Sequence, residues 1–435
     1  MKRTQNHTYD IIVAGGGQAG CAAAIAAARR GSKVLLIEQS ASLGGMGTNG
    51  LVPCYAPFDD GKKPLYGGIT YEIMECNNVA FGGEKYRHYT NWPLIAAEKL
   101  KFVLDTMVSE SGCDILFNTF VCDAVVENGN IKYITAVNKS GFTDFYAQKF
   151  IDCTGDADVA ALADVPFQVG NEYGEVQASS LCFTITGINT EGLGEIYGKA
   201  EGSVVKQMIA SGKYPEIKGH DHMVTCLIAP NTIIFNAGHI HLNNLNAEET
   251  SAAYLEGRKM ADAFLRGLKE FLPDHFENAQ LIQTAPTLGT RESRRIEGEY
   301  TLTYKDYFDR KVFEDEICRN HYWIDAHPTK TEFANGRHSA TEVPVMGKAF
   351  EPGESHGIPF RSLLPKVLDN LLVAGRTISC DRYALAAVRV MPNCLATGEA
   401  AGVAAAIASK QNIGFHALST DELRTELRKN GAHFE

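Results

Sequence analysis

Hydrophobic and polar positions near the start of the chain predict a strand, a helix and a second strand. Residues 9–14 form a short apolar run typical of a buried strand. Residues 19–30 are rich in alanine and predict a helix that stops at Gly31, and residues 33–38 predict the second strand. These lengths match one βαβ unit, so the pattern favours an α/β fold.

Further along, residues 93–110 have the apolar spacing of a helix. Residues 115–126 and 131–137 predict a β-meander that turns at residues 128–129, Asn-Gly. Residues 150–153 predict another short strand.

From about residue 160 to 350 the pattern changes to short strands, polar helices and many aromatic residues, without a glycine-rich nucleotide motif. Residues 370–374 then return to an apolar strand, and residues 392–409 predict a long alanine-rich helix. We therefore expect a discontinuous nucleotide-binding domain made of residues 1–160 and 351–435, with an inserted α+β substrate or cap domain at residues 161–350.

Composition narrows the class of protein. The chain has 435 residues, 45% of them hydrophobic, and a formal net charge of -11, which argues against a nucleic-acid partner. The eleven cysteines have no C-x-x-C spacing, which indicates reduced thiols. The apolar stretches 11–28 and 400–408 do not have the character of membrane spans, and the first ten residues do not resemble a secretory signal. We expect a globular, cytoplasmic protein without a membrane span.

The first motif with chemical content is GGGQAG at residues 15–20, which matches G-x-G-x-x-G between a predicted strand and a predicted helix. Such glycines let the backbone approach a pyrophosphate at the helix N-terminus. Glu38 ends the second strand, where an acid would accept hydrogen bonds from a ribose. Together these features predict a dinucleotide site.

Four elements in this order resemble the two-dinucleotide-binding-domain flavoproteins. They are the glycine motif, Glu38 with GG at residues 44–45, the TGD of residues 154–156, and NLLVAGR at residues 370–376. The segments LGTRESRRI (288–296), GIPFRSLLP (357–365), VRVMPNC (388–394) and GEAAG (398–402) are similar to the bacterial FAD-dependent oxidoreductase family, distantly like fumarate reductase and aspartate oxidase flavoproteins. The resemblance covers nearly the whole chain and is weakest at residues 170–280. It implies FAD in a Rossmann-like domain of the GR2 type, and it implies no particular substrate.

The residues expected to bind FAD come from these motifs and from the segments beside them. They are Gly15, Gly17, Gln18, Ala19, Gly20, Glu38, Gln39, Gly44, Gly45, Met46, Val121, Thr154, Gly155, Asp156, Gly375, Arg376, Met391 and Asn393. Pro392 sits where a helix would begin, and the resemblance places the pyrimidine edge of the flavin there, near free N–H groups that stabilise negative charge. The segment 45–49 has no histidine, so we expect FAD to be bound non-covalently.

Four residues are candidates for catalysis. Arg291 and Arg295 would share a face of a helix or turn and could fix a carboxylate or phosphate, although ion pairs with the interleaved glutamates would explain them equally well. Arg389 could face the flavin ring, and His356 could act as an acid or base beside it. The spaced pairs His220/His222, His239/His241 and His321/His327 lack a metal-binding pattern, so no metal is expected.

The leading hypothesis is an FAD-dependent oxidoreductase that transfers a hydride between FAD and a small organic substrate. Only one dinucleotide fingerprint is present, so the electron donor or acceptor would be external. Two alternatives are left: non-redox chemistry on a bound flavin, as in a lyase or hydratase, and a flavin-binding subunit of a redox complex. A homo-oligomer is also left open.

Overall fold

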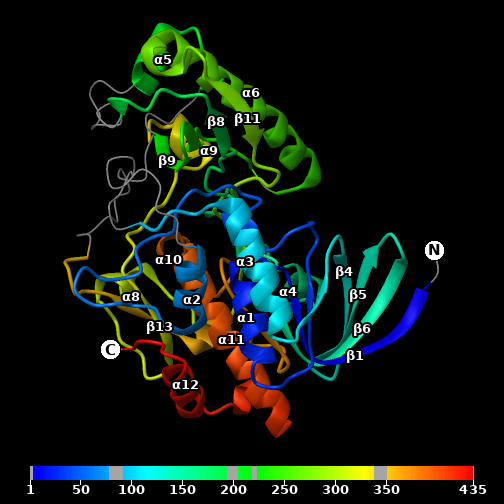
Figure 1. Cartoon of the computed structure of the whole chain (residues 1–435). Helices are drawn as coiled ribbons and strands as arrows, with labels where there is room; N and C mark the ends of the chain where they lie inside the picture. The colour runs from blue at the N-terminus through cyan, green and yellow to red at the C-terminus, as the bar shows by residue number, and fades with distance from the viewer. Residues whose placement is uncertain are drawn as a thin grey trace.

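A seven-stranded sheet forms the lower half of the molecule (Figure 1). The computed structural model describes residues 3–77, 92–193, 204–217, 223–243, 245–337 and 350–434. The strand order is β3-β2-β1-β6-β5-β4, and β15 pairs with the end of β6. The bounds are β1 Arg3–Ala14, β2 Val34–Ile37, β3 Asp114–Leu116, β4 Phe120–Glu127, β5 Asn130–Asn138, β6 Gly141–Asp152 and β15 Leu371–Val373.

The sheet is parallel on one side and antiparallel on the other. β1 lies between β2 and β6, parallel to both, and β3 and β15 extend this parallel part. β4, β5 and β6 are antiparallel, with the predicted turn at residues 128–129. The predicted strand 115–126 is wrong in one respect: it breaks at residues 117–119, where Asn118 adopts a φ of 50°, and its two halves belong to different edges of the sheet. The α/β fold is confirmed.

Two alanine-rich helices pack against each other across one face of this sheet (Figure 1). They are α1 (Gln18–Ala28) and α11 (Met391–Gln411), close to the predicted bounds. A Cβ atom added at Gly398 would lie 2.0 Å from the carbonyl oxygen of Ala19, and one at Gly402 would lie 2.2 Å from that of Ala23. Glycine at these positions therefore permits the close approach that joins the two ends of the discontinuous domain.

Other helices lie in the same part of the molecule. Their bounds are α2 Gly68–Asn77, α3 Ala97–Glu110, α4 Asp158–Leu162, α8 Tyr304–Phe308, α10 Arg382–Val388 and α12 Thr420–Lys429. Two small antiparallel pairs complete this part, β7 (Phe167–Val169) with β12 (Arg294–Ile296) and β13 (Glu316–Asn320) with β14 (His356–Pro359).

The upper part of the molecule in Figure 1 is the cap, built on a four-stranded antiparallel sheet of order β11-β8-β10-β9. The elements of the cap are β8 Phe183–Thr186, β9 Met223–Ala229, β10 Thr232–Ala237, β11 Gln280–Thr284, α5 Val204–Ser211, α6 Ala247–Phe271 and α7 Pro273–Phe276. The short helix α9 (Lys330–Ala334), from a later segment of the chain, lies beside this sheet. The long helix α6 begins at the N-cap Asn246, whose side chain accepts from the Glu249 backbone N–H. Phe183, Phe235 and Phe264 pack together in the centre of this core.

The predicted domain boundaries at residues 161 and 350 stay a prediction. The packing favours a narrower insertion, because the hydrophobic core of the cap takes its residues mainly from 176–288. Residues 302–326 instead share a core with α1 and α11. We therefore propose that the chain returns from the cap to the part with the seven-stranded sheet soon after residue 288.

Among the described helices, none alone is both long and apolar enough to cross a bilayer; α10 and α11 satisfy that test only as a pair, which bends by 92° between them.

Candidate active site

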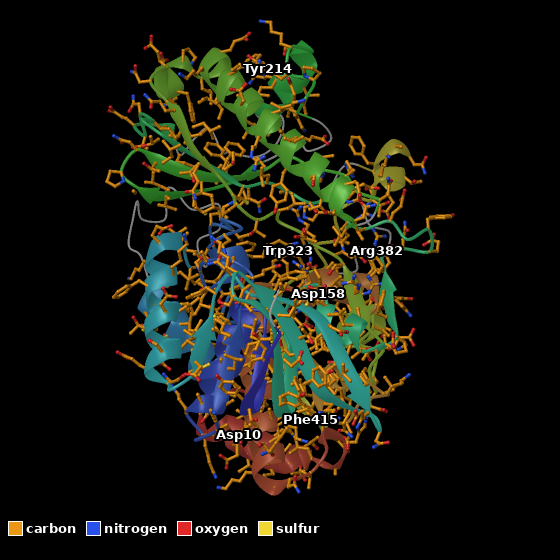
Figure 2. All side chains as sticks on the ribbon, turned by 90° about the vertical axis from the view of Figure 1, so that its right-hand side faces the viewer. Asp10, Asp158, Tyr214, Trp323, Arg382 and Phe415 are labelled. Atoms are coloured by element: carbon orange, nitrogen blue, oxygen red, sulfur yellow. The ribbon has the colours of Figure 1, made fainter. Side chains whose placement is uncertain are left out.

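One large cavity lies between the sheet and the cap, with lining residues from both. Figure 2 shows Trp323 and Asp158, two of these residues, at the junction of the upper and lower parts of the molecule, while Tyr214 marks the far end of the cap. The walls of the cavity include the carboxyl ends of the parallel strands, which is where open α/β sheets bind ligands.

At one end of the cavity, the N-terminus of α1 is open. The N-cap Gly17 offers no side chain to satisfy the first N–H groups, and a Cβ atom at Gly17 would meet no protein atom within 4 Å. Gly15 has a φ of 92°, which favours glycine. Glu38 accepts hydrogen bonds from the backbone N–H groups of Gly16 (2.6 Å) and Ser40 (2.7 Å), which fixes its carboxylate at the cavity wall. A pyrophosphate and ribose fit this arrangement.

Farther along, a second helix N-terminus opens on the same cavity. α11 begins after Val390 with no side-chain cap, and Met391 and Cys394 of its first turn line the wall. Opposite them lies Gly45, which follows the left-handed Gly44 (φ 98°). Two uncapped helix N-termini therefore supply partial positive charge to one elongated cavity, which suits the pyrophosphate and the electron-rich edge of a flavin.

Arg376 holds three wall segments together. Its Nε donates to the carbonyl of Gly155 (2.7 Å), one Nη to that of Thr290 (2.6 Å), and the other to the Asp156 carboxylate (2.9 Å). This arginine therefore joins the TGD turn to the segment that carries Arg291.

Most of the predicted cofactor residues meet at this cavity. Those that line it are Gly15, Gly17, Gln18, Ala19, Glu38, Gln39, Gly45, Met46, Val121, Thr154, Gly155, Asp156, Gly375, Arg376 and Met391. Gly20, Gly44 and Asn393 do not. A Cβ at Gly20 would lie 1.8 Å from the carbonyl oxygen of Gly15, so the absence of a side chain at Gly20 allows the loop to close. Asn393 is hydrogen-bonded to Tyr66 and Asn320.

Arg291 and Arg389 both line the cavity and are partly buried. Arg291 donates from Nη1 to the carbonyl of Ala178 (2.7 Å) and to Ser180 Oγ (3.0 Å), and Arg389 donates to the carbonyl of Asp325 (2.8 Å). Burial lowers the pKa of Arg291 to about 10, and the nearby Arg389 adds to this. Arg291 therefore stays charged at neutral pH.

Arg295 and His356 are placed elsewhere, which does not support the predicted catalytic roles. Arg291 and Arg295 share no helical face, because the chain is extended here and enters β12 at Arg294. Arg295 is 3% exposed, forms an ion pair with Glu292, and donates to the carbonyl of Cys380. His356 is fully buried in β14, where Asn320 donates to its Nε2 (3.1 Å) and its Nδ1 donates to the carbonyl of Gly357 (3.0 Å). Both are structural in this arrangement.

The sequence reasoning missed an acid–base chain at the same wall. Asp325 and His327 line the cavity with 3.3 Å between Asp325 Oδ2 and His327 Nε2. His327 Nδ1 lies 2.7 Å from Nε2 of His239, a buried residue of the cap. The Asp-x-His spacing was a usable signal, but it gave no hint that His239 would join from the cap. Of the other spaced histidines, His239 and His241 are in ring contact, and His220 and His222 fall outside the described residues.

The charges around this chain determine its protonation. Burial lowers the pKa of His327 to about 4, the charge of Arg291 contributes, and Asp325 opposes both. Burial alone would raise the pKa of Asp325, but His327, Arg389 and Arg291 hold it well below its ordinary value. At neutral pH Asp325 is therefore ionised and His327 neutral. His327 Nε2–H then donates to Asp325, and its Nδ1 accepts from His239.

Comparisons with known proteins agree with this site. A family model described as FAD dependent oxidoreductase matches residues 10–427. No curated protein sequence matches the chain. Similar solved structures include a geranylgeranyl bacteriochlorophyll reductase-like protein from Thermoplasma acidophilum (14% identity, 99% of this chain and 93% of that chain, TM-score 0.44) and a p-nitrophenol 4-monooxygenase from Pseudomonas putida DLL-E4 (11%, 98% and 86%, 0.47). A flavin-dependent brominase is similar at 11% identity over 97% of this chain and 83% of that chain, with a TM-score of 0.47.

The TM-scores of these structures are below 0.5, so we infer no function from them. The family match and the cavity together identify the family of the chain. The family match spans almost the whole chain, and the open glycine loop, Glu38 and the second helix N-terminus fit an FAD molecule. The chain belongs to the FAD dependent oxidoreductase family.

Proposed function

We propose that this FAD-dependent oxidoreductase acts on a small organic anion held by Arg291 and Arg389 beneath the cap. The observation that carries the proposal is the meeting of both arginines with Asp325 and His327 on one wall of the FAD cavity. When bound, FAD supplies the acceptor or donor of a hydride. The chain's own residues then have to hold the substrate, exclude water and move one proton.

The local charge favours an anion. Among the described residues at this end of the cavity, Arg291 and Arg389 contribute two positive charges and Asp325 one negative charge, which leaves an excess of one positive charge; a third arginine of the wall, Arg376, is paired with Asp156. A carboxylate is the natural ligand for two partly buried guanidinium groups, because it accepts paired hydrogen bonds from each. Cap residues Ser180 and Cys182 line the cavity beside Arg291, and partial burial among protein atoms strengthens the attraction.

The same anion would activate the proton-moving residues. Both arginines lower the pKa of His327, and a bound carboxylate offsets their charge. Burial, the main cause of the lowered pKa, remains, but substrate binding raises the pKa of His327 above about 4 and so brings its proton exchange closer to neutral pH. In the present tautomers the N–H groups of His239 and His327 both point along the chain toward the ionised Asp325, which stabilises a proton that His327 gains and leaves His327 able to give it up. His327 can thus serve hydride transfer in either direction.

The proposal also covers how FAD is bound, the second electron partner and the location of the protein. We propose that FAD is bound non-covalently and that the second electron partner is external. A cytoplasmic location agrees with the eleven cysteine thiols, all of which are free.

The test is an anaerobic screen of the purified yellow protein with small organic acids, their alcohols and their amides, following the loss of the visible absorbance of oxidised flavin. The reduced protein is screened in parallel with unsaturated and keto acids. We expect only anions to change the redox state, and Arg291→Gln and Arg389→Gln to abolish the response while retaining FAD. Turnover of neutral compounds by both variants would overturn the proposal. Acid precipitation that leaves the flavin on the protein would refute non-covalent binding.

A further inference from the structure

The only two tryptophans in the chain, Trp92 and Trp323, line the same cavity. Their ring centroids are 5.6 Å apart, and Tyr322 lies 5.8 Å from Trp92 and 4.4 Å from Trp323. The three rings form what we call the aromatic wall. Trp92 precedes α3 and the other two follow β13, so segments distant in sequence bring these rings together.

The aromatic wall lies next to the anion-binding charges. The Tyr322 hydroxyl donates to Asp325 Oδ2 (3.2 Å), and Arg389 donates to the backbone carbonyl of the same Asp325 (2.8 Å). A single residue thus joins the rings to the cation. Figure 2 shows Trp323 at the junction with the cap, and residues from both parts line the cavity there.

Part of the remaining cavity surface is apolar or weakly polar. Cys54 and Val52 line the cavity from the FAD-binding part, and Cys182 and Val224 line it from the cap. Burial raises the pKa of the Cys182 thiol to about 12, so this thiol is neutral at physiological pH. A second charged group on the ligand would have no described counter-charge at these four residues.

We propose that the substrate is a monocarboxylate carrying an aromatic ring, with its carboxylate at Arg291 and Arg389 and its ring on the aromatic wall. This inference rests on the proposed function, because it takes the two arginines as the anion site. Planar rings gain from offset or edge contacts with aromatic side chains beyond the burial of area alone. An aliphatic acid of the same length would lose that gain while keeping the charge interaction.

The holoenzyme is titrated with three probes of similar length: 3-phenylpropanoate, hexanoate, and the neutral 3-phenylpropan-1-ol. Quenching of tryptophan fluorescence reports binding at the aromatic wall, the flavin visible spectrum reports binding beside the cofactor, and calorimetry gives the Kd. We expect 3-phenylpropanoate to bind roughly three- to tenfold more tightly than hexanoate. In Trp323→Leu this preference should disappear, with the Kd of hexanoate changed by less than about twofold. The matched control is Phe102→Leu, which removes an aromatic ring that is 73% exposed on α3.

The outcomes separate the two proposals. Equal or tighter binding of hexanoate, or a preference that survives Trp323→Leu, overturns the aromatic substrate. If Trp323→Leu instead weakens FAD binding and leaves the preference intact, the aromatic wall serves the cofactor ring and the inference is also wrong. Equal binding of the neutral alcohol and the acid would overturn the anion site of the proposed function, whatever the effect of Trp323→Leu.

Discussion

His239 Nε2 and His327 Nδ1 lie 2.7 Å apart, although one ring belongs to the cap and the other to the segment that returns to the FAD-binding part. The contact ties the protonation state of the cavity wall to the position of the cap. A neutral His327 that holds its Nε2–H toward Asp325 has Nδ1 left as an acceptor, and His239 supplies the donor for it.

His239→Gln is therefore expected to retain FAD and substrate affinity but to slow the proton-coupled step by roughly 10- to 100-fold. The measurement is stopped-flow flavin reduction or reoxidation across pH, with the solvent deuterium isotope effect. The isotope effect should grow in the variant because proton delivery becomes limiting. His433→Gln, at an exposed position, is the control, and an unchanged pH profile in His239→Gln would assign His239 a packing role only.

Binding of a carboxylate is expected to take up protons below about pH 6.5, because the bound charge raises the pKa of His327 from about 4. Calorimetric titration in two buffers of different ionisation enthalpy measures this uptake directly. It should be absent at pH 8, where His327 is neutral with and without ligand, and should be lost in His327→Gln. Proton release in place of uptake would contradict the assignment.

Arg291→Gln is expected to weaken binding of the anionic substrate by about 2–4 kcal/mol, roughly 30- to 1,000-fold in Kd, since it removes one of two partly buried cations from the anion site. Arg291→Lys should recover part of the loss by restoring the charge without the guanidinium fork. Arg266→Gln removes a half-exposed arginine from α6 and should have no effect on the Kd. The two glutamine variants differ from wild type by the same charge, which makes the comparison fair.

Alanine substitutions at two glycines of the GGGQAG motif are expected to have different effects, one on FAD binding and the other on stability. Gly17→Ala places a methyl group in space free of protein atoms, so the apoprotein should keep its melting temperature while its affinity for FAD falls. Gly20→Ala places a methyl group 1.8 Å from the Gly15 carbonyl oxygen and should destabilise the fold itself. Thermal unfolding without FAD and fluorimetric titration with FAD separate the two effects. Equal loss of apoprotein stability in both would contradict the open space at Gly17.

His356 gives a prediction for stability. Burial lowers the pKa of His356 to about 4 from an ordinary 6.5. Between these pH values the imidazole is therefore protonated in the unfolded chain and neutral in the folded protein. The contribution of His356 to the free energy of unfolding is present above pH 6.5. It is lost as the pH falls to about 4, at up to roughly 1.4 kcal/mol per pH unit. His356→Gln keeps an acceptor for Asn320 without titrating. Urea unfolding at several pH values should show a shallower acid dependence in the variant.

The cofactor half of the site followed from sequence because its signals are local. The glycine loop, Glu38 and the TGD turn each need particular residues at fixed spacing, and fifteen of the predicted residues line the cavity. The strand and helix order followed from periodicity for the same reason. The break at Asn118 was missed, since an apolar run does not show where the chain changes from one edge of a sheet to the other.

The substrate-binding half of the site could not be predicted from local sequence patterns. Arg291 and Arg295 look equivalent in sequence, and only the ion pair with Glu292 and the burial in three dimensions distinguish them. Asp325 meets Arg389, and His327 meets the cap residue His239, through long-range packing that no local pattern encodes.

The close packing of α1 against α11 also has a consequence for synthesis of the protein. Gly398 and Gly402 seat α11 directly on the carbonyls of α1, and Met391 at its start completes the cavity that the glycine loop begins. A nascent chain on the ribosome carries the first half of the FAD cradle long before the second half exists. Loading of the flavin must therefore await release of the C-terminal segment, and a chain cut before residue 391 would expose the apolar face of α1 and become a substrate for chaperones and proteases.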